Sequence, residues 1–359
     1  VQNNCVSSIE AVAAAARFIL AGEGELYVAG GTEVMSRMPY TISGHRGQKE
    51  LRSLETVRAA IAGGGAGVTF LDSIEQGLTD PVKGINMAGT AEVCAQMFAV
   101  TREEQDDYAR ESFRRTIAGW NEGFYASHVV PVGNGAVLLE KDEYPFLRAD
   151  LVEKPQLFVK ASPLFDNAAY SLKDFYRDHG RHIRGKTHRE GDKGTVTLFN
   201  SCSRSDGAAA VIVAAERRAK ELGLEIMAEL KGWGYSGTDP AHMGFAPALA
   251  APVALSRAGL AFDALDLIEL HEPFAATVLA LFKVGRERFG HDWAGKNASG
   301  ALNANGGSIA LGHPLGATGV RLLLNLLYGL KRSPKACRGM LAACAGGGVG
   351  GAMVVEKIL

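Results

Sequence analysis

The sequence predicts an α/β fold made of two similar halves, with a region of different character inserted into the first half. Near the N-terminus a helix, a short apolar strand and glycines follow one another, and the same order recurs near the C-terminus. The region between them carries a strongly charged helix and a basic stretch instead. A chain of 359 residues is long enough for two ordinary domains, or for one large domain with an insertion.

The N-terminal unit begins with a helix over residues 5–20, because apolar residues recur there at helical spacing and Gly22 supplies a stop. A short apolar strand over residues 26–29 follows and runs into Gly30 and Gly31. The order is therefore loop, helix, strand and glycine.

The C-terminal unit repeats this order. Apolar residues at helical spacing mark a helix around residues 320–327, a buried strand covers residues 340–343, and a glycine turn follows at residues 346–348. The two ends of the chain therefore resemble distant copies of one unit, which is the pattern of an α/β fold with a buried sheet.

The middle of the chain differs from both ends. It contains a charged helix near residues 102–120 and the basic stretch RHIRGKTHREGDK at residues 181–193. A buried strand over residues 208–215 resumes the α/β pattern, and a later strand over residues 267–270 leads into HEPFAA. We therefore expect an N-terminal half of residues 1–40 and 195–226, incomplete at its start, an inserted loop domain of residues 41–194, and a C-terminal half of residues 227–359.

Composition and charge exclude several classes of protein. With 38 Lys and Arg against 39 Asp and Glu, a general nucleic-acid binder is not expected. No apolar run approaches the ~18 residues of a membrane span, and no secretory signal is visible. The five cysteines form no CxxC pair, so we expect neither a disulfide framework nor a metal site, and a cytoplasmic location.

Cys5 lies where a loop enters the first predicted helix. First-turn N–H groups and the helix dipole favour an anion there, so the position is suited to a thiolate nucleophile. The alternative is a buried structural cysteine, which this feature alone does not exclude.

Three further residues occupy similar positions. His313 lies in GHPLG between glycines, with Pro314 at a plausible first helical position. Cys344 ends a strand and is followed by three glycines, whose N–H groups can form an anion-binding nest. His271 also ends a strand, with Glu272 beside it. Strand ends are where α/β sheets carry their sites, so the set predicts one composite site.

Five segments of the sequence resemble the thiolase family, in the right order and over nearly the whole chain. The first resembles the thiolase nucleophile segment, the second joins the loop domain back to the first half, and the last three resemble the C-terminal active-site motifs. The segments are NNCVSSIEAVAAAARFILAGEGELYVAGGTEVMSR, TVTLFNSCSRSDGAAAV, LIELHEPFAA, NANGGSIALGHPLGATG and CAGGGVGGAMVVE.

The resemblance implies a role for each of the four residues. Cys5 would be the acyl-accepting nucleophile, His313 its base, and Cys344 the acid and base at the acetyl α-carbon. His271 stands where most thiolases have asparagine, and HEPF is similar to the HEAF of trifunctional-enzyme β subunits. The implied oxyanion holes are His313 with a water held by His271, and the backbone N–H groups of Cys5 and Gly346.

The same resemblance implies the reaction and its partners. The expected activity is thiolytic cleavage of a 3-ketoacyl-CoA, or the reverse Claisen condensation, as in fatty acid β-oxidation and lipid metabolism. CoA would be a substrate, bound on the side of the inserted loop domain, and no cofactor would be needed. We expect a homodimer or homotetramer, and a hydratase/dehydrogenase subunit is a candidate partner. Candidate contacts with the substrate and CoA are Asn86, Met87, Cys202, Arg204, Met243 and Phe274.

The resemblance also implies duplicated βαβαβαββ halves that form a layered α/β/α/β/α core. Thiolases place several strands and helices before the nucleophile, whereas only Val1 to Asn4 precede Cys5 here. We therefore expect that N-terminal strands of the first half are missing from this sequence.

Three other functions compete with a catalytic thiolase. A ketoacyl-synthase-like condensing enzyme would lack the second cysteine, so Cys344 speaks against it. A sterol-carrier-type thiolase would have that cysteine where Pro273 stands. A non-catalytic thiolase-like binding or scaffold subunit is permitted by the altered CoA contacts, but it would have no reason to keep all four site residues.

Overall fold

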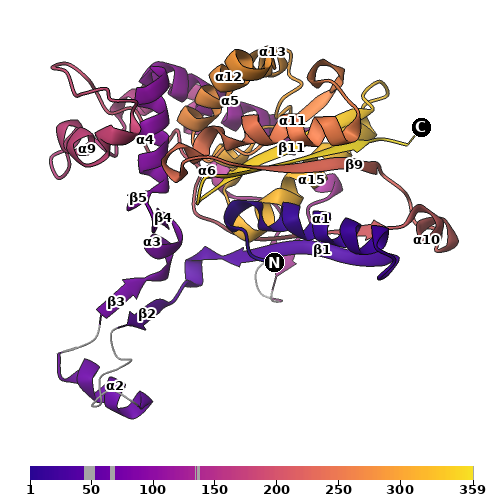
Figure 1. Cartoon of the computed structure of the whole chain (residues 1–359), viewed down its shortest axis with the longest axis horizontal. Helices are drawn as coiled ribbons and strands as arrows, with labels where there is room; N and C mark the ends of the chain where they lie inside the picture. The colour runs from indigo at the N-terminus through magenta and orange to yellow at the C-terminus, as the bar shows by residue number, and fades with distance from the viewer. Residues whose placement is uncertain (44–52, 65–68, 134, 136–137, 359) are drawn as a thin grey trace.

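Two β-sheets with a layer of helices between them form the body of the molecule (Figure 1). The computed structural model describes residues 1–43, 53–64, 69–133, 135 and 138–358. One sheet pairs two antiparallel strands, and the other has four strands in the order β10-β11-β12-β9, of which only β10 and β11 run parallel. The strands are β1 (Leu26–Val34), β8 (Asp206–Ala214), β9 (Glu229–Gly237), β10 (Leu267–Leu270), β11 (Arg338–Ala345) and β12 (Val349–Glu356).

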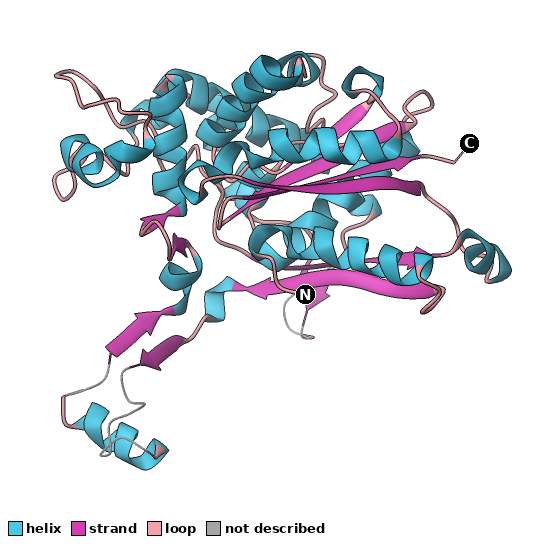
Figure 2. Cartoon of the chain, in the orientation of Figure 1, coloured by secondary structure: helices cyan, strands magenta, loops and turns pink. Residues whose placement is uncertain are grey.

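Two long helices separate the sheets (Figure 2). Helix α1 (Ser7–Leu20) contacts β1, β8 and β12, while α15 (Leu315–Arg332) contacts β1 and β8 on one side and β10 and β11 on the other. Helix α11 (Ala246–Ala258) covers the second face of the four-stranded sheet, and α12 (Ala275–Phe289) packs beside it. The described residues thus form four of the five expected layers.

The first strand is longer than the sequence pattern predicted. The glycine pair does not end it at residue 29, because β1 continues to Val34 and pairs with β8 along its whole length. A Cβ atom on Gly31 would lie 1.8 Å from the carbonyl oxygen of Gly316. The glycine therefore serves a close approach of the strand to the start of α15, and not a turn.

The outer face of the two-stranded sheet carries exposed apolar side chains. Val28 and Ile212 are opposite each other across the pair and are 73% and 56% exposed. The inner face packs on α1 and α15, where Ala29 is buried. The expected fifth layer, a set of helices over this outer face, is not found among the described residues.

The inserted region consists of a helical part and a projecting part. Helices α4 (Met87–Phe98) and α5 (Arg102–Asn121) pack against α12. The hairpin of β2 (Tyr40–Ser43) and β3 (Thr69–Asp72) extends away from the body together with α2 (Leu54–Ala62), as Figure 1 shows.

The remaining elements are short, apart from the eight-residue α9. They are α3 (Ser73–Gly77), β4 (Thr79–Asp80), β5 (Ile85–Asn86), β6 (Val132–Gly133), β7 (Leu138–Leu139), α6 (Tyr144–Leu147), α7 (Asp150–Glu153), α8 (Gln156–Lys160), α9 (Leu172–His179), α10 (Glu216–Glu221), α13 (Trp293–Ala298) and α14 (Ser308–Leu311). The boundaries expected between the N-terminal half, the inserted loop domain and the C-terminal half, at residues 40, 194 and 226, remain predictions. No helix in the described part of the chain is both long and apolar enough to cross a membrane.

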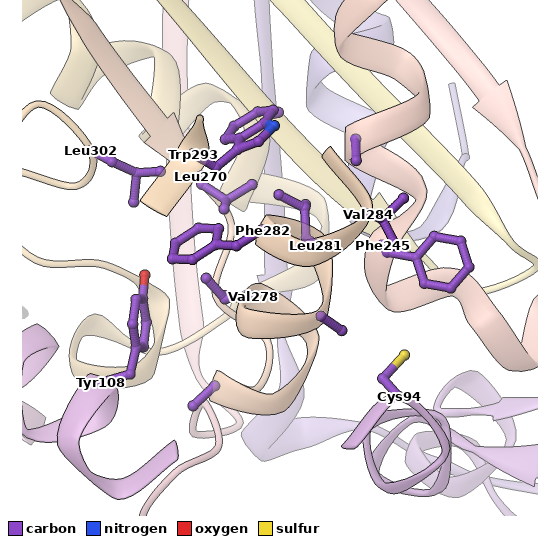
Figure 3. Packing of buried hydrophobic residues seen from close by; sticks show 14 of the residues in the cluster. Cys94, Tyr108, Phe245, Leu270, Val278, Leu281, Phe282, Val284, Trp293 and Leu302 are labelled. Atoms are coloured by element: carbon purple, nitrogen blue, oxygen red, sulfur yellow. The ribbon is translucent and has the colours of Figure 1, made fainter. Parts of the chain in front are cut away.

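A shared hydrophobic core holds the inserted region on the C-terminal half (Figure 3). Phe282 and Val278 of α12 lie among side chains of β10, of the inserted helices and of α13. Tyr108 from α5 meets Phe282 edge to face, with ring centroids 6.2 Å apart. Full burial of each such side chain stabilises the fold by about 1.5–3 kcal/mol. The packing fixes α4 and α5 relative to the strand end that carries His271.

Candidate active site

Cys5 lies in a short 3-10 turn, η1 (Asn4–Val6), that contacts both β11 and α15. Asn4 adopts a positive φ of 47°, which asparagine tolerates better than most residues. Its Nδ2 donates a hydrogen bond to the carbonyl oxygen of Gly346, at 2.9 Å. This bond joins the nucleophile turn to the glycine turn that follows β11, although the two are 342 residues apart in sequence.

Cys5 is half-buried, and the loss of hydration at its thiol raises the pKa to about 12. Hydrogen bonds from the backbone N–H groups of Gly346 and of Cys5 itself lower the pKa, but they offset only part of the desolvation. The expectation that the helix entry stabilises a resting thiolate is therefore wrong. The turn runs directly into α1, so the N–H groups and the dipole of the helix start are present, but the loss of hydration around the sulfur outweighs them.

Cys344 is the second-last residue of β11 and lies close to Cys5. Its side chain is buried, and burial together with the nearby Cys5 raises its pKa well above that of a free thiol. Strand β11 contacts η1 directly. The structure thus brings together two thiols from opposite ends of the chain.

His271 and His313 lie beside each other, with ring centroids 4.1 Å apart and planes tilted by 44°. His271 follows β10, where its backbone N–H donates to the carbonyl of Ala342 in β11 at 2.9 Å. His313 comes just before α15, and its backbone N–H donates to the carbonyl of Ser203 at 3.0 Å. The strand end and the helix start therefore hold the two imidazoles in one place.

Both imidazoles are neutral in this site. Burial lowers the pKa of His313 to about 3, with a smaller effect from the positive charge of Arg321. Burial, the neighbouring His313 and then Arg321 lower the pKa of His271 well below its ordinary value. The Nε2 atom of each ring is buried and has no hydrogen-bond partner among the described residues. Each ring therefore keeps one nitrogen free for a substrate or a thiol.

Glu272 anchors the loop that carries His271. Its carboxylate accepts hydrogen bonds from the hydroxyls of Tyr108 (2.9 Å) and Ser112 (2.7 Å), both on α5, and from Nδ2 of Asn303 (2.5 Å). A Cβ atom on Gly307 would lie 2.3 Å from the Glu272 carboxyl carbon, so only glycine fits there. His271 and Glu272 thus have different roles: His271 faces the site, and Glu272 ties the loop to the inserted region.

The candidate substrate contacts divide into two groups. Met87, Met243 and Phe274 are brought together, because they belong to one buried apolar cluster with Cys344. A Cβ atom on Gly346 would lie 3.4 Å from Sδ of Met87, which places this cluster against the glycine turn. It forms an apolar wall beside the two thiols.

The other three candidates have structural partners. Cys202 lies near Cys5; desolvation and then the neighbouring Cys5 raise the pKa of its thiol. Its N–H donates to the carbonyl of Pro273 at 2.9 Å. The Asn86 side chain caps α4 by accepting from the N–H of Gly89 at 2.7 Å. The Arg204 guanidinium forms an exposed ion pair of 2.6 Å with Glu75.

Three polar residues around the histidines were not singled out from the sequence. Ser308 and Thr318 contact the Nδ1 atoms of the two rings, and Arg321 contacts Ser308. All three lie in or just after the segment NANGGSIALGHPLGATG, which carried the resemblance as a whole. Spacing alone did not reveal them, because the rings that they contact belong to other elements. His271 follows β10, and His313 lies in the loop before α15.

Comparison with known proteins agrees with this geometry. Residues 1–155 match the family described as thiolase, N-terminal domain, and residues 224–357 match thiolase, C-terminal domain. An acetyl-CoA acetyltransferase of Cupriavidus necator is 35% identical over 358 residues, which cover 98% of this chain and 78% of the relative. The chain belongs to the thiolase family.

Solved structures of thiolases have the same fold. Human mitochondrial 3-ketoacyl-CoA thiolase in complex with CoA aligns with a TM-score of 0.79 and 30% identity, over 99% of this chain and 77% of that one. Acetyl-CoA acetyltransferase from Syntrophomonas wolfei aligns with a TM-score of 0.82 and 28% identity, over 100% of this chain and 79% of that one. The thiolase fold expected from the sequence is confirmed.

The arrangement in this thiolase can perform acyl transfer. It offers a nucleophilic thiol, an adjacent imidazole, a second thiol and two backbone N–H groups in a buried site. Nucleophile, base, acid and oxyanion donors are the components that a covalent acyl-transfer mechanism requires. Among the described residues no group of three or more His, Cys, Asp or Glu side chains is arranged to hold a metal ion.

Proposed function

We propose that this acyltransferase of the thiolase family cleaves 3-ketoacyl-CoA with CoA, or runs the reverse condensation, through an acyl group on Cys5. The observation that carries the proposal is that Cys5 lies near Cys344 of β11, and that His271, whose N–H bonds to Ala342 of the same strand, lies beside His313. Both Nε2 atoms are free among the described residues. The acetyl-CoA acetyltransferases and the 3-ketoacyl-CoA thiolase among its relatives support the substrate class.

The first step is attack by Cys5 on the 3-keto carbon. Because the thiol pKa is raised, the proton leaves the sulfur as the S–C bond forms, and Nε2 of His313 accepts it. The carbonyl electron pair moves to oxygen and gives an alkoxide. The donors for this alkoxide are the backbone N–H groups of Cys5 and Gly346, which already contact the Cys5 sulfur.

The second step is collapse of the alkoxide and cleavage of the C–C bond. The leaving group is the enolate of acetyl-CoA, whose α-carbon takes a proton from the thiol of Cys344. His313, protonated in the first step, and His271, either directly or through a water molecule that it holds, serve as donors to the thioester oxygen on which the enolate charge lies. The acyl group remains on Cys5 as a thioester.

The third step transfers the acyl group to CoA. Cys344, left as a thiolate by the second step, takes the proton of the CoA thiol. The CoA sulfur attacks the acyl carbon, and the Cys5 sulfur leaves and takes back the proton held by His313. One thioester replaces another at every turnover, so the proposed chemistry calls on no metal or redox cofactor, and CoA is a substrate. Met87, Met243 and Phe274 are proposed to pack against the pantetheine and acyl portions.

The assembly and location are also proposals. We propose that the protein forms a homodimer or homotetramer in a reducing compartment such as the cytoplasm. We also propose that it acts in β-oxidation, with a hydratase/dehydrogenase subunit as its candidate partner. All five cysteines are free, which supports a reducing environment.

Kinetic assays test the proposed function directly. The protein should cleave acetoacetyl-CoA or a long-chain 3-ketoacyl-CoA in the presence of CoA, and the ratio of the two rates gives the chain-length preference. Cys5→Ala should lower turnover by ~10²-fold or more, since it removes the nucleophile. Cys337→Ala, which changes a free cysteine at the opposite end of β11, is the matched control and should keep full activity. If neither substrate is turned over, the scaffold alternative replaces this proposal.

A further inference from the structure

The two imidazoles of the site make similar contacts that have opposite consequences. Nδ1 of His271 lies 2.8 Å from the Ser308 hydroxyl oxygen, and Nδ1 of His313 lies 2.7 Å from the Thr318 hydroxyl oxygen. A neutral imidazole has one N–H and one bare nitrogen. The direction of each hydroxyl therefore decides whether the free Nε2 atom is a donor or an acceptor.

The Ser308 hydroxyl donates to His271. Nη2 of Arg321 lies 2.6 Å from the Ser308 oxygen, and a guanidinium can only donate, so the serine oxygen is the acceptor of that bond. The serine side chain is fully buried, and His271 Nδ1 is the acceptor available to its own proton among the described residues. A hydroxyl proton pointing elsewhere would be buried without a partner, at a cost of about 1–3 kcal/mol. Nδ1 of His271 is therefore bare, and Nε2 carries the proton.

The Thr318 hydroxyl accepts from His313. Its oxygen lies 2.9 Å from the carbonyl oxygen of Pro314, and a carbonyl can only accept, so the threonine proton lies between these two oxygens. The lone pairs of the threonine oxygen then face Nδ1 of His313, which must carry a proton to bond them. Nε2 of His313 is therefore bare.

We propose that Ser308 with Arg321, and Thr318, are positioning residues that hold the two histidines in opposite tautomers. His313 then presents an acceptor to the Cys5 proton, while His271 presents an N–H donor to the thioester oxygen on which the enolate charge develops. As the S–C bond forms, the proton moves from Sγ of Cys5 to Nε2 of His313, and the carbonyl electron pair moves to oxygen. Arg321 acts through Ser308 and makes no contact with the reacting atoms.

The kinetic consequence of this inference rests on the proposed function, but the tautomers do not. They can be read by ¹⁵N NMR of protein labelled at its nine histidines, near neutral pH and without substrate. The signals are assigned by their loss in His271→Gln and His313→Gln. The expected pattern is a protonated Nε2 in His271 and a protonated Nδ1 in His313. Any other pattern in the unmutated protein overturns the proposal, whether or not the protein turns over substrate.

Matched variants of Arg321 test its part in the arrangement. In Arg321→Met the serine oxygen loses its donor and can accept from Nδ1–H, so His271 should populate the other tautomer. In the proposed reaction kcat should then fall ~10-fold or more, with KM for CoA within about twofold, since an oxyanion donor is worth ~10²–10³-fold. Arg321→Lys keeps a group that can only donate, and should restore a large part of both the tautomer and kcat. A fall in kcat with an unchanged His271 tautomer would show a merely structural role and contradict the proposal.

Discussion

At the scale of single residues, burial of the thiol and of its base determines how the site can work. Burial raises the pKa of Cys5 to about 12 and lowers that of His313 to about 3, so both are neutral before substrate binds. A neutral pair in a dry site avoids the cost of two buried charges. The proton must then move while the S–C bond forms, when the developing oxyanion adds a compensating charge.

The neutral state of His313 also predicts a dependence of stability on pH. Its pKa is about 3 in the folded chain and 6.5 in its ordinary state, so the unfolded chain binds more protons between these values. Stability is therefore full above pH 6.5 and falls as the pH drops below it, by up to about 1.4 kcal/mol per pH unit. In urea unfolding from pH 7.5 to 5, the unfolding free energy of the unmutated protein should fall more steeply than that of His313→Gln. Parallel curves would show that His313 is not buried as a neutral group.

The residue types of the site were predictable from the sequence, but their protonation was not. Cys5, His271, His313 and Cys344 could each be placed at a loop or strand end. Burial could not be foreseen, because it comes from side chains of β11, α4 and α12 that are far away along the chain. Because burial was not foreseen, the sequence indicated a thiolate at Cys5, whereas the structure has a neutral thiol.

At the scale of elements, the packing of α1 on α15 sets the distance between nucleophile and base. Gly319 of α15 has no side chain, and a Cβ atom there would lie 2.6 Å from Cγ1 of Ile9 and 2.8 Å from its backbone nitrogen. The Ser8 hydroxyl accepts from the N–H of Val320 at 3.0 Å, which ties the same two turns together. The turn that carries Cys5 comes directly before this contact.

Substitution of Gly319 should therefore separate these elements. Gly319→Ala should lower the unfolding free energy by about 1–3 kcal/mol, as overpacking does. It should also lower kcat, because the added methyl group would push α1, and with it the turn that holds Cys5, away from His313. Gly329→Ala on the same helix is the control, since its Cβ would meet only the end of the Leu267 side chain, at 3.2 Å. It should be neutral or stabilising, because alanine favours the helix by up to about 1 kcal/mol. Equal losses in both variants, measured by urea unfolding, would contradict the packing account.

Helical and strand periodicity predicted most of these elements, with limited accuracy at their ends. The first helix was expected over residues 5–20, and the structure divides it into a 3-10 turn and α1. The first strand was expected to stop at residue 29, and it continues to Val34. In both cases a distant contact decides: the glycine turn after β11 holds Asn4, and the start of α15 occupies the space beside Gly31.

At the scale of the whole molecule, the fold brings four side chains from positions 5 to 344 into one buried site between two sheets. β10 and β11 run parallel, so His271 and Cys344 emerge at the same edge of the sheet. The helical layer between the sheets brings Cys5 and His313 to that edge from the other side. The duplicated order of elements predicted this convergence, whereas the apolar wall of Met87, Met243 and Phe274 comes from packing that one sequence does not reveal.

The central claim is that Cys5 carries the acyl group and Cys344 moves the proton at the acetyl α-carbon. Cys344→Ser separates these roles, because a serine hydroxyl is far less acidic than a thiol and cannot easily transfer that proton. After brief exposure to acyl-CoA, mass spectrometry of this variant should find the acyl group on the Cys5 peptide. Its overall turnover should be lower by ~10²-fold or more. An adduct on Cys344 or Cys94 in the unmutated protein, or near-normal turnover by Cys344→Ser, would contradict the account.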